Sequence, residues 1–413
     1  MIRKPMLIAL FVLLGMSVVQ SGAQESALHN GDRVVFYGDS ITAQRLYTRF
    51  VEDFVLTRNP RMHVTFWNAG VSGDTVYGGY TGDMPARLKR DVLPHQPTVI
   101  TIMLGMNDGY YMAFNQKYLD NYKNGYRKLL DALQTGLPAA RVTLISPTPY
   151  DEITHGTEFA DYNQVVSRHS AFVKDLAASP HLGFSDFNEA VTNMLNAGAS
   201  KSGPLAALLV PDRIHPAEAA HWVMAATLAR SWGFSPVVSS LRLDASTGKT
   251  AAAENTQVAD FKILDGKLQW TQTDNALPLP LQLGDEIMQF ALSVSDLAEM
   301  DKQVLSVTGL TAPQYTLKID GNKIASFTRQ ELSTGVNLAL YATPMESQAK
   351  GVDGIELKRV RLDEARFILA IEDPKVANDA DATSTMAAKD AALASEQRSE
   401  AQPKPHSFEL SPE

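Results

Sequence analysis

A serine stands where a strand-like apolar run has to turn. The run "VVFYGDSITAQ" covers residues 34–44, and Ser40 lies just beyond its apolar part. A serine hydroxyl becomes a nucleophile when a base takes its proton, and that base is commonly a histidine held by a carboxylate. The segment "DRIHPAEAAH" supplies both groups, because Asp212 and His215 are three residues apart, before a helix predicted to begin at Pro216. One tight turn lets Asp212 reach the Nδ1–H of His215 and leaves Nε2 free to face the sheet edge.

Acyl transfer also needs hydrogen-bond donors aimed at the oxygen that becomes negative in the transition state. Gly73 in "NAGVSGDT" offers a backbone N–H that no Cβ obstructs, and Asn107 in "LGMND" offers a side-chain amide. Each of these stretches, like the Asp-x-x-His pair, is explained more simply by turn formation or helix capping when it is taken alone. We expect Asp39 to cap the helix after the turn and Asp108 to be structural.

A parallel sheet would bring these residues together. From residue 31 to about residue 236, strand-like and helix-like stretches alternate. The strands are continuous apolar runs, as in residues 99–104, which is typical of strands buried on both faces. The helices are amphipathic, with apolar side chains every three or four positions in residues 162–176. The pattern predicts a three-layer α/β/α, flavodoxin-like fold, whose strands bind ligands at their carboxyl ends.

Four blocks of sequence carry a resemblance to a known family. The blocks "GDSIT", "NAGVSGDT", "GMND" and "DRIHP" resemble, in order and context, the conserved blocks of the SGNH hydrolases, also called GDSL esterases and lipases. The resemblance covers about residues 31–236. It implies that Ser40 is the nucleophile and that Asp212 and His215 complete a catalytic triad. It also implies an oxyanion hole formed by the N–H of Ser40, the N–H of Gly73 and the side chain of Asn107, with no metal or cofactor.

Two residues depart from the usual form of these blocks. Ile41 replaces the leucine of the first block, and Met106 stands where a second glycine is frequent. If its flexible side chain turns inward, Met106 narrows the acyl pocket; the alternative is that it packs into the sheet. Four tyrosines flank the second and third blocks, and they either line a sugar-binding or aryl-binding cleft or cover the sheet edge: Tyr77, Tyr80, Tyr110 and Tyr111.

The pattern changes after residue 232. The segments "ILDGKLQW" and "LKIDGNKIASF" each place Asp-Gly between strand-like runs, which is the strongest short signal for a β-hairpin. We therefore predict a second, smaller β-rich domain over residues 237–372, with a helix near residues 287–300. Residues 373–413 are mainly Ala, Ser, Asp, Glu and Pro, with hardly any large apolar side chains, so we expect a disordered tail.

The N-terminus has the pattern of a secretory signal peptide. Arg3 and Lys4 precede the apolar stretch "MLIALFVLLGMSVV", and small residues follow in "SGAQ". We expect residues 1–23 to be cleaved off after Ala23 during export; the alternative is an uncleaved N-terminal anchor. Periplasmic and secreted destinations both fit this pattern.

The composition narrows the function further. The 413 residues contain no cysteine, which excludes disulfides, thiol catalysis and cysteine-ligated metals. Loss of Arg3 and Lys4 with the signal peptide leaves 35 basic and 46 acidic residues, a net charge of −11. A chain this acidic is a poor candidate for binding nucleic acid or an anionic membrane surface. Its length indicates two or more globular domains.

The resemblance and the export signal together imply an exported serine ester hydrolase that works through an acyl-enzyme on Ser40. A short-acyl ester, in particular an O-acetyl group on a carbohydrate, is the expected substrate, and a lipid or aryl ester is the close alternative. Two other classes stay open: a non-catalytic glycan-binding scaffold, and a metallophosphoesterase, for which too few metal ligands can be placed. The expected partner is the ester substrate, small or polymeric, without stable membrane insertion after cleavage.

Overall fold

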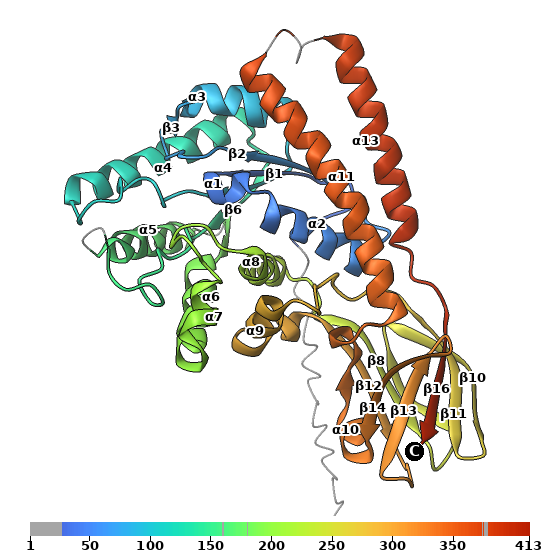
Figure 1. The fold of residues 1–413 in the computed structure, drawn as a ribbon. Coiled ribbons are helices and arrows are strands. Elements are labelled where there is room, and N and C mark those ends of the chain that lie inside the picture. The colour runs from blue at the N-terminus through green and yellow to red at the C-terminus, as the bar shows by residue number, and fades with distance from the viewer. Residues whose placement is uncertain (1–26, 159–160, 180, 374, 376–378) are drawn as a thin grey trace, which may run out of the picture.

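A parallel sheet of five strands forms the centre of the N-terminal part of the molecule (Figure 1). The computed structural model describes residues 27–158, 161–179, 181–373, 375 and 379–413. The strand order is β2-β1-β5-β6-β7, and neighbouring strands pair in parallel. The bounds are β1 (Arg33–Gly38), β2 (Thr65–Gly70), β5 (Val99–Met103), β6 (Arg141–Ile145) and β7 (Leu182–Ser185).

Helices cover both faces of this sheet. Successive side chains of β1 point to opposite faces, so that Val34 and Phe36 join one core while Val35 and Tyr37 join the other. The three-layer α/β/α fold predicted from the continuous apolar runs is therefore confirmed. The helices and the short hairpin of this part are α1 (Ser40–Ala43), α2 (Leu46–Arg58), β3 (Gly78–Gly79), β4 (Gly82–Asp83), α3 (Met84–Arg87), α4 (Gln116–Gly136), α5 (Tyr162–Leu176), α6 (Phe187–Lys201), α7 (Gly203–Ala207) and α8 (Glu218–Ser231).

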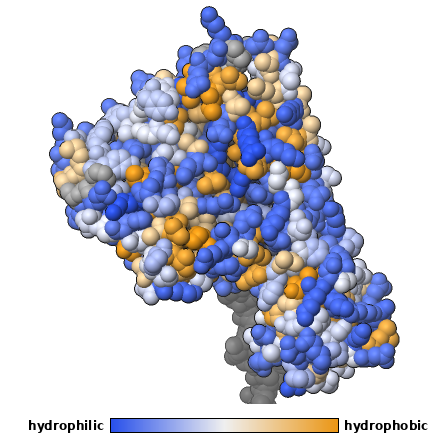
Figure 2. Space-filling view, viewed as in Figure 1, coloured by the Kyte–Doolittle hydropathy of each residue, from blue (hydrophilic) through white to orange (hydrophobic). Residues whose placement is uncertain are grey.

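The C-terminal part is rich in strands, as predicted. One sheet has the order β10-β11-β16-β13-β14 and the other β15-β12-β8-β9, and both contribute side chains to one apolar core. The face of this part seen in Figure 2 is mainly hydrophilic. Its elements are β8 (Val237–Asp244), β9 (Lys249–Glu254), β10 (Thr256–Leu264), β11 (Lys267–Asp274), α9 (Glu286–Val294), β12 (Lys302–Thr308), β13 (Gln314–Ile319), β14 (Asn322–Thr328), α10 (Arg329–Thr334), β15 (Val336–Asn337), α11 (Pro344–Glu372), α13 (Ala380–Glu400) and β16 (His406–Pro412).

The two Asp-Gly pairs form the tight turns expected of them. Asp265 and Gly266 join β10 to β11 with φ angles of 52° and 78°, and Asp320 and Gly321 join β13 to β14 with φ angles of 50° and 80°. Positive φ at both central residues matches the right-handed twist of the flanking strands, and Asp-Gly tolerates this conformation. The prediction of β-hairpins at these positions is confirmed.

The expectation of a disordered tail over residues 373–413 is wrong. Helix α13 packs against α11 as the second arm of a helical hairpin, and β16 lies between β11 and β13 in the middle of a sheet (Figure 1). Alanine is the best helix former, so a helix of small residues is stable once a neighbouring helix covers it. In β16, Phe408 and Leu410 alternate with polar residues and face the core. The composition of the whole tail hides this short alternating pattern.

C-terminal elements also pack on the N-terminal part. Leu279, Leu281 and Met288 belong to the same apolar core as α2 and α8. Helix α11 lies against α2, where Asp353 pairs with Arg49 at 3.3 Å. The division of the chain at residues 236 and 237 stays a prediction, because these contacts cross it.

The predicted signal peptide and its cleavage site lie outside the described residues. Within the described part of the chain, no helix has the length and apolar character needed to cross a membrane.

The central position of β16 makes its apolar side chains necessary for stability. Leu410 is fully buried and pairs with Leu268 on one side and Leu317 on the other. We expect Leu410→Ala to lower the free energy of unfolding by about 2–5 kcal/mol, because it leaves a cavity in the core. Urea unfolding followed by tryptophan fluorescence measures this loss. The matched control is Ser407→Ala at an exposed position of the same strand; equal midpoints for the two variants would contradict the role of β16.

Candidate active site

Ser40 begins α1, directly beyond the end of β1. Asp39 caps this helix, because its Oδ1 accepts a hydrogen bond from the backbone N–H of Ile41 at 3.0 Å. The helix lies directly on the end of β2: a Cβ on Gly70 would come within 2.3 Å of the backbone nitrogen of Ala43. The helix ends after one turn, where Arg45 adopts a left-handed conformation with φ of 60°. The turn predicted at the end of the apolar run therefore holds Ser40 at the carboxyl edge of the sheet.

Three of the predicted site residues are joined by hydrogen bonds. Asp212 Oδ2 lies 2.7 Å from His215 Nδ1, and His215 Nε2 lies 2.8 Å from Ser40 Oγ. A carboxylate oxygen only accepts, so Nδ1 carries the proton of the neutral imidazole. Nε2 is then an acceptor, and the hydroxyl of Ser40 donates to it. This geometry suits transfer of the serine proton to the imidazole.

The carboxylate of Asp212 stays ionised in this position. Partial burial opposes its charge, but hydrogen bonds from the backbone N–H and the ring of His215, and from the N–H of Ile214, together hold the pKa of Asp212 below its usual value. An ionised carboxylate fixes the orientation of the imidazole and stabilises the positive charge that it gains on protonation.

A neighbouring loop holds the turn that carries Asp212 and His215. Within this turn Arg213 has a left-handed backbone with φ of 71°, and its carbonyl accepts a hydrogen bond from the N–H of Asp151 at 2.8 Å. Its guanidinium donates to the carbonyl of Gly156 at 2.6 Å. These long-range contacts were not foreseen from the sequence, because no local pattern links residues 151–156 to this turn.

The expected oxyanion donors lie on the loops that follow β2 and β5, the two neighbours of β1. Gly73 has a left-handed backbone with φ of 75° and is exposed. Asn107 is half-buried, and its Nδ2 donates to the backbone carbonyl of Asp74 at 3.0 Å. The two donors are thus joined through Asp74, whereas no hydrogen bond among the described residues links either donor directly to Ser40.

An ion-pair network behind this loop was missed in the sequence. Arg87 is fully buried, binds the carboxylate of Asp74, donates to Asp91 Oδ2 at 2.7 Å and donates to the carbonyl of Ala69 at 2.5 Å. Its guanidinium also lies over the ring of Tyr37 at 4.8 Å. The spacing of Arg87 and Asp91 by four residues was the available signal, since such pairs meet on one face of a helix.

Three buried carboxyl groups meet behind the site. Burial raises the pKa of Asp39 to about 7 and that of Asp108 to about 7, and the charge of Asp74 adds to both shifts. Burial also raises the pKa of Asp74 to about 6, although the ion pair with Arg87 favours its charged form. Asp108 Oδ1 accepts from the N–H of Val76 at 3.0 Å, whereas its buried Oδ2 has no hydrogen-bond partner. The structural role expected of Asp39 and Asp108 agrees with these contacts.

A second histidine links the nucleophile turn to α8. Burial lowers the pKa of His221 to about 3, so its ring is neutral. Nδ1 accepts from the N–H of Tyr47 at 3.2 Å, and Nε2 therefore donates to Gln44 Oε1 at 2.9 Å. The backbone N–H of Gln44 in turn donates to the carbonyl of Ser40 at 3.0 Å. These contacts connect the turn of Ser40 to α8 and α2.

Met106 packs in the apolar core. Its side chain is fully buried and belongs to the same apolar cluster as Tyr150 and Tyr162, so of the two placements that the sequence left open the structure shows packing into the core. Of the four flanking tyrosines, Tyr80 is 80% exposed and Tyr110 is 59% exposed.

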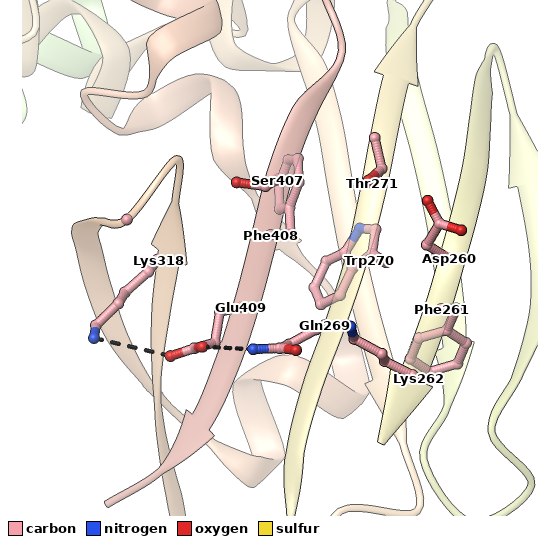
Figure 3. A pocket seen from close by; sticks show the side chains of 11 residues that line it. Asp260, Phe261, Lys262, Gln269, Trp270, Thr271, Lys318, Ser407, Phe408 and Glu409 are labelled. Carbon is pink, nitrogen blue, oxygen red and sulfur yellow. Dashed lines mark hydrogen bonds and ion pairs between the residues drawn. The ribbon is translucent and has the colours of Figure 1, made fainter. Parts of the chain in front are cut away.

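A separate hollow of about 750 Å³ lies on the C-terminal sheet (Figure 3). Glu409 crosses it, accepting from Gln269 Nε2 at 2.9 Å and pairing with Lys318 at 3.8 Å. Trp270 and Phe408 also line it, but they are only 2% and 3% exposed. Phe261, which also lines the hollow, is half-buried, so the hollow offers one partly exposed aromatic ring beside the paired side chains of Glu409, Gln269 and Lys318.

Comparisons with known proteins found a family match and an esterase relative. Residues 36–223 match the GDSL-like Lipase/Acylhydrolase family. An acetylxylan esterase of Geobacillus stearothermophilus is 27% identical over 230 residues, which are 50% of this chain and 95% of that protein. A solved structure of an acetylxylan esterase from the same organism covers 50% of this chain and 97% of its own, with 24% identity and a TM-score of 0.42.

A further structural relative covers nearly the whole chain. The structure of a gut microbial diltiazem-metabolizing enzyme covers 94% of this chain and 98% of its own, with 24% identity and a TM-score of 0.80. The likeness is one of fold, and it includes both the parallel-sheet part and the β-rich part.

The buried carboxyl groups predict a loss of stability as the pH rises. The folded pKa of Asp108, about 7, exceeds the ordinary value of 3.8, so the folded state binds the proton more tightly than the unfolded chain. Stability linked to this group is fully present below about pH 4 and is lost as the pH rises to about 7. We expect Asp108→Asn to raise the free energy of unfolding by about 1–3 kcal/mol at pH 8 and by much less at pH 5.

Thermal unfolding of both proteins at pH 5 and pH 8 measures this difference. The control is Asp131→Asn at an exposed position of α4, which removes one negative charge without removing a buried carboxyl. A gain for Asp108→Asn that is the same at both pH values would contradict the ionisation of a buried group.

Proposed function

Since residues 36–223 match the GDSL-like Lipase/Acylhydrolase family, we propose that this chain is an exported esterase that removes short acyl groups, above all acetyl, from carbohydrates. The observation that carries the proposal is the chain of hydrogen bonds from Ser40 through His215 to Asp212, with heavy-atom distances of 2.8 and 2.7 Å.

In the first step the hydroxyl oxygen of Ser40 attacks the ester carbonyl carbon. His215 Nε2 takes the serine proton, and Asp212 stabilises the imidazolium that results. The N–H groups of Ser40 and Gly73 and one N–H of the Asn107 amide bind the carbonyl oxygen as it becomes negative. The intermediate collapses when His215 returns the proton to the leaving alcohol, and an acyl-enzyme remains.

In the second step water replaces the alcohol. His215 accepts a proton from the water, whose oxygen attacks the acyl carbon of the ester on Ser40. Collapse of this second intermediate releases the carboxylic acid and returns the proton to Ser40. Every proton transfer uses the same imidazole, so the reaction needs no group beyond the side chains and backbone of this chain.

Two observations support a carbohydrate acetyl ester as substrate. An acetylxylan esterase is 27% identical over nearly its whole length. Tyr77, Tyr80 and Tyr110 expose aromatic rings on the loops after β2 and β5, and such rings stack on sugars. The exposed tyrosines serve an aryl ester equally well, so a lipase or arylesterase of the same family is the second candidate.

The remaining alternatives have less support. A glycan-binding scaffold would use the hollow on the C-terminal sheet, where Trp270 and Phe408 are buried and Phe261 is half-buried. A metallophosphoesterase would bind metal through grouped acidic and histidine side chains; within the described ranges no three such side chains are grouped in this way. Activity that survives a chelator would separate the esterase from this last alternative.

Export is part of the proposal. The basic residues Arg3 and Lys4, the apolar stretch after them and the small residues before Ala23 support a cleaved signal peptide. A carbohydrate ester outside the cytoplasm is then the accessible substrate.

The esterase proposal predicts the effect of removing the nucleophile. We expect Ser40→Ala to lower kcat for 4-nitrophenyl acetate by about 10³-fold or more, because the remaining groups cannot form an acyl-enzyme. The matched control is Ser72→Ala, an exposed serine of the loop after β2, which should keep full activity. Equal rates for wild type and Ser40→Ala, with both proteins folded, would overturn the assignment.

The preference for short acyl groups is tested separately. We expect kcat/KM to fall at least about tenfold from acetyl to octanoyl 4-nitrophenyl esters, since a pocket built for acetyl excludes the longer chain. Rates of acetate release from acetylated xylo-oligosaccharides and from an aryl acetate show whether the enzyme prefers a carbohydrate or an aryl alcohol as the leaving group. Octanoyl esters that react faster than acetyl esters would return a lipid ester as the substrate.

A further inference from the structure

The side chain of Tyr111 reaches back to the amide assigned to the oxyanion hole. Its hydroxyl lies 3.0 Å from Asn107 Oδ1, four residues earlier in the chain. We propose that Tyr111 is a positioning residue: it fixes the amide of Asn107 so that one N–H is held ready for the oxyanion. The inference rests on the proposed function, because it assigns Tyr111 a role in the same reaction.

The hydrogen bonds allow only one orientation of this amide. The carbonyl of Asp74 only accepts, so the group of Asn107 that lies 3.0 Å from it must be Nδ2. Oδ1 of Asn107 then faces Tyr111, whose hydroxyl must donate. The contact with Asp74 uses one of the two N–H bonds of Nδ2, and the second N–H is available for a substrate oxygen.

The hydroxyl of Tyr111 keeps its proton under working conditions. Burial raises the pKa of Tyr111 above its ordinary value, and the charges of Asp39 and Asp212 act in the same direction. These two carboxylates belong to the nucleophile turn and to the histidine turn, so Tyr111 lies within electrostatic reach of both. A protonated phenol that donates to Oδ1 also polarises the amide and makes its N–H groups better donors.

The surrounding structure holds Tyr111 in place. Its ring lies 4.9 Å from that of Tyr162, centroid to centroid, and the hydroxyl of Tyr162 donates to the carbonyl of Met106 at 2.6 Å. Tyr162 therefore contacts the backbone directly before Asn107, and Tyr111 contacts the side chain of Asn107. Both Tyr110 and Tyr111 have left-handed backbones, with φ of 56° and 55°.

This backbone conformation is unfavourable for bulky residues and persists only where the surroundings impose it. Two consecutive residues of this kind turn the chain so that neighbouring tyrosines have different environments. Tyr110 is 59% exposed and packs its ring on Tyr118, whereas Tyr111 is half-buried and faces Asn107. Tyr118 of α4, whose ring packs on that of Tyr110, is the control for Tyr111.

A double-mutant cycle on the mature chain tests the proposal, with kcat and KM measured for 4-nitrophenyl acetate. We expect Tyr111→Phe to lower kcat about 5–30-fold with KM within about twofold, because the lost hydrogen bond acts on the transition state. Asn107→Ala should lower kcat about 10²–10³-fold. In the Asn107→Ala background, Tyr111→Phe should change kcat by less than about twofold, since no amide remains to be positioned.

The control Tyr118→Phe should leave kcat unchanged. A merely structural role for Tyr111 would lower kcat by the same factor in both backgrounds, and that result overturns the proposal. An unchanged kcat in Tyr111→Phe, with Asn107→Ala impaired, overturns it as well while leaving the proposed function intact. If Asn107→Ala itself keeps full activity, the oxyanion hole of the proposed function fails, and the role of Tyr111 fails with it.

Discussion

The candidate site depends on one buried ion pair, between Arg87 and Asp74. Arg87 has no exposed surface and is also bound to Asp91, so its position is set by the core. Asp74 directly follows Gly73, and its carbonyl accepts the hydrogen bond from Asn107. A movement of Asp74 would therefore displace Gly73 and Asn107, the two proposed oxyanion donors, together. Removing one partner of a buried pair costs about 3–5 kcal/mol, so the loop has few competing conformations.

The carboxylate of Asp74 also repels the negative charges of two neighbouring buried carboxyl groups. Burial, together with the charge of Asp74, raises the pKa values of Asp39 and Asp108 to about 7, although Asp39 caps the helix that begins at Ser40. Stability linked to these groups therefore decreases as the pH rises.

The C-terminal part braces the N-terminal part at both ends of α2. Arg45, just before this helix, donates to Asp363 of α11 at 2.5 Å and lies over the ring of Phe367. Arg58, at its other end, pairs with the buried Asp301 at 2.6 Å. The helix after the turn of Ser40 is thus held by elements more than 200 residues away in the chain. The diltiazem-metabolizing enzyme, whose structure covers 94% of this chain, shares the fold of both parts.

The sequence by itself determined the features that depend only on residues close together in the chain. The apolar run before Ser40 defined a buried strand and its turn, and the spacing of Asp212 and His215 let them meet within one turn. Only the tertiary structure decided where Met106 points, because a flexible apolar side chain fits a core or a pocket equally well. The tertiary structure also decided that residues 406–412 form a strand. Their two large apolar side chains bury too little surface alone, and they form a strand because β11 and β13 supply hydrogen bonds on both sides.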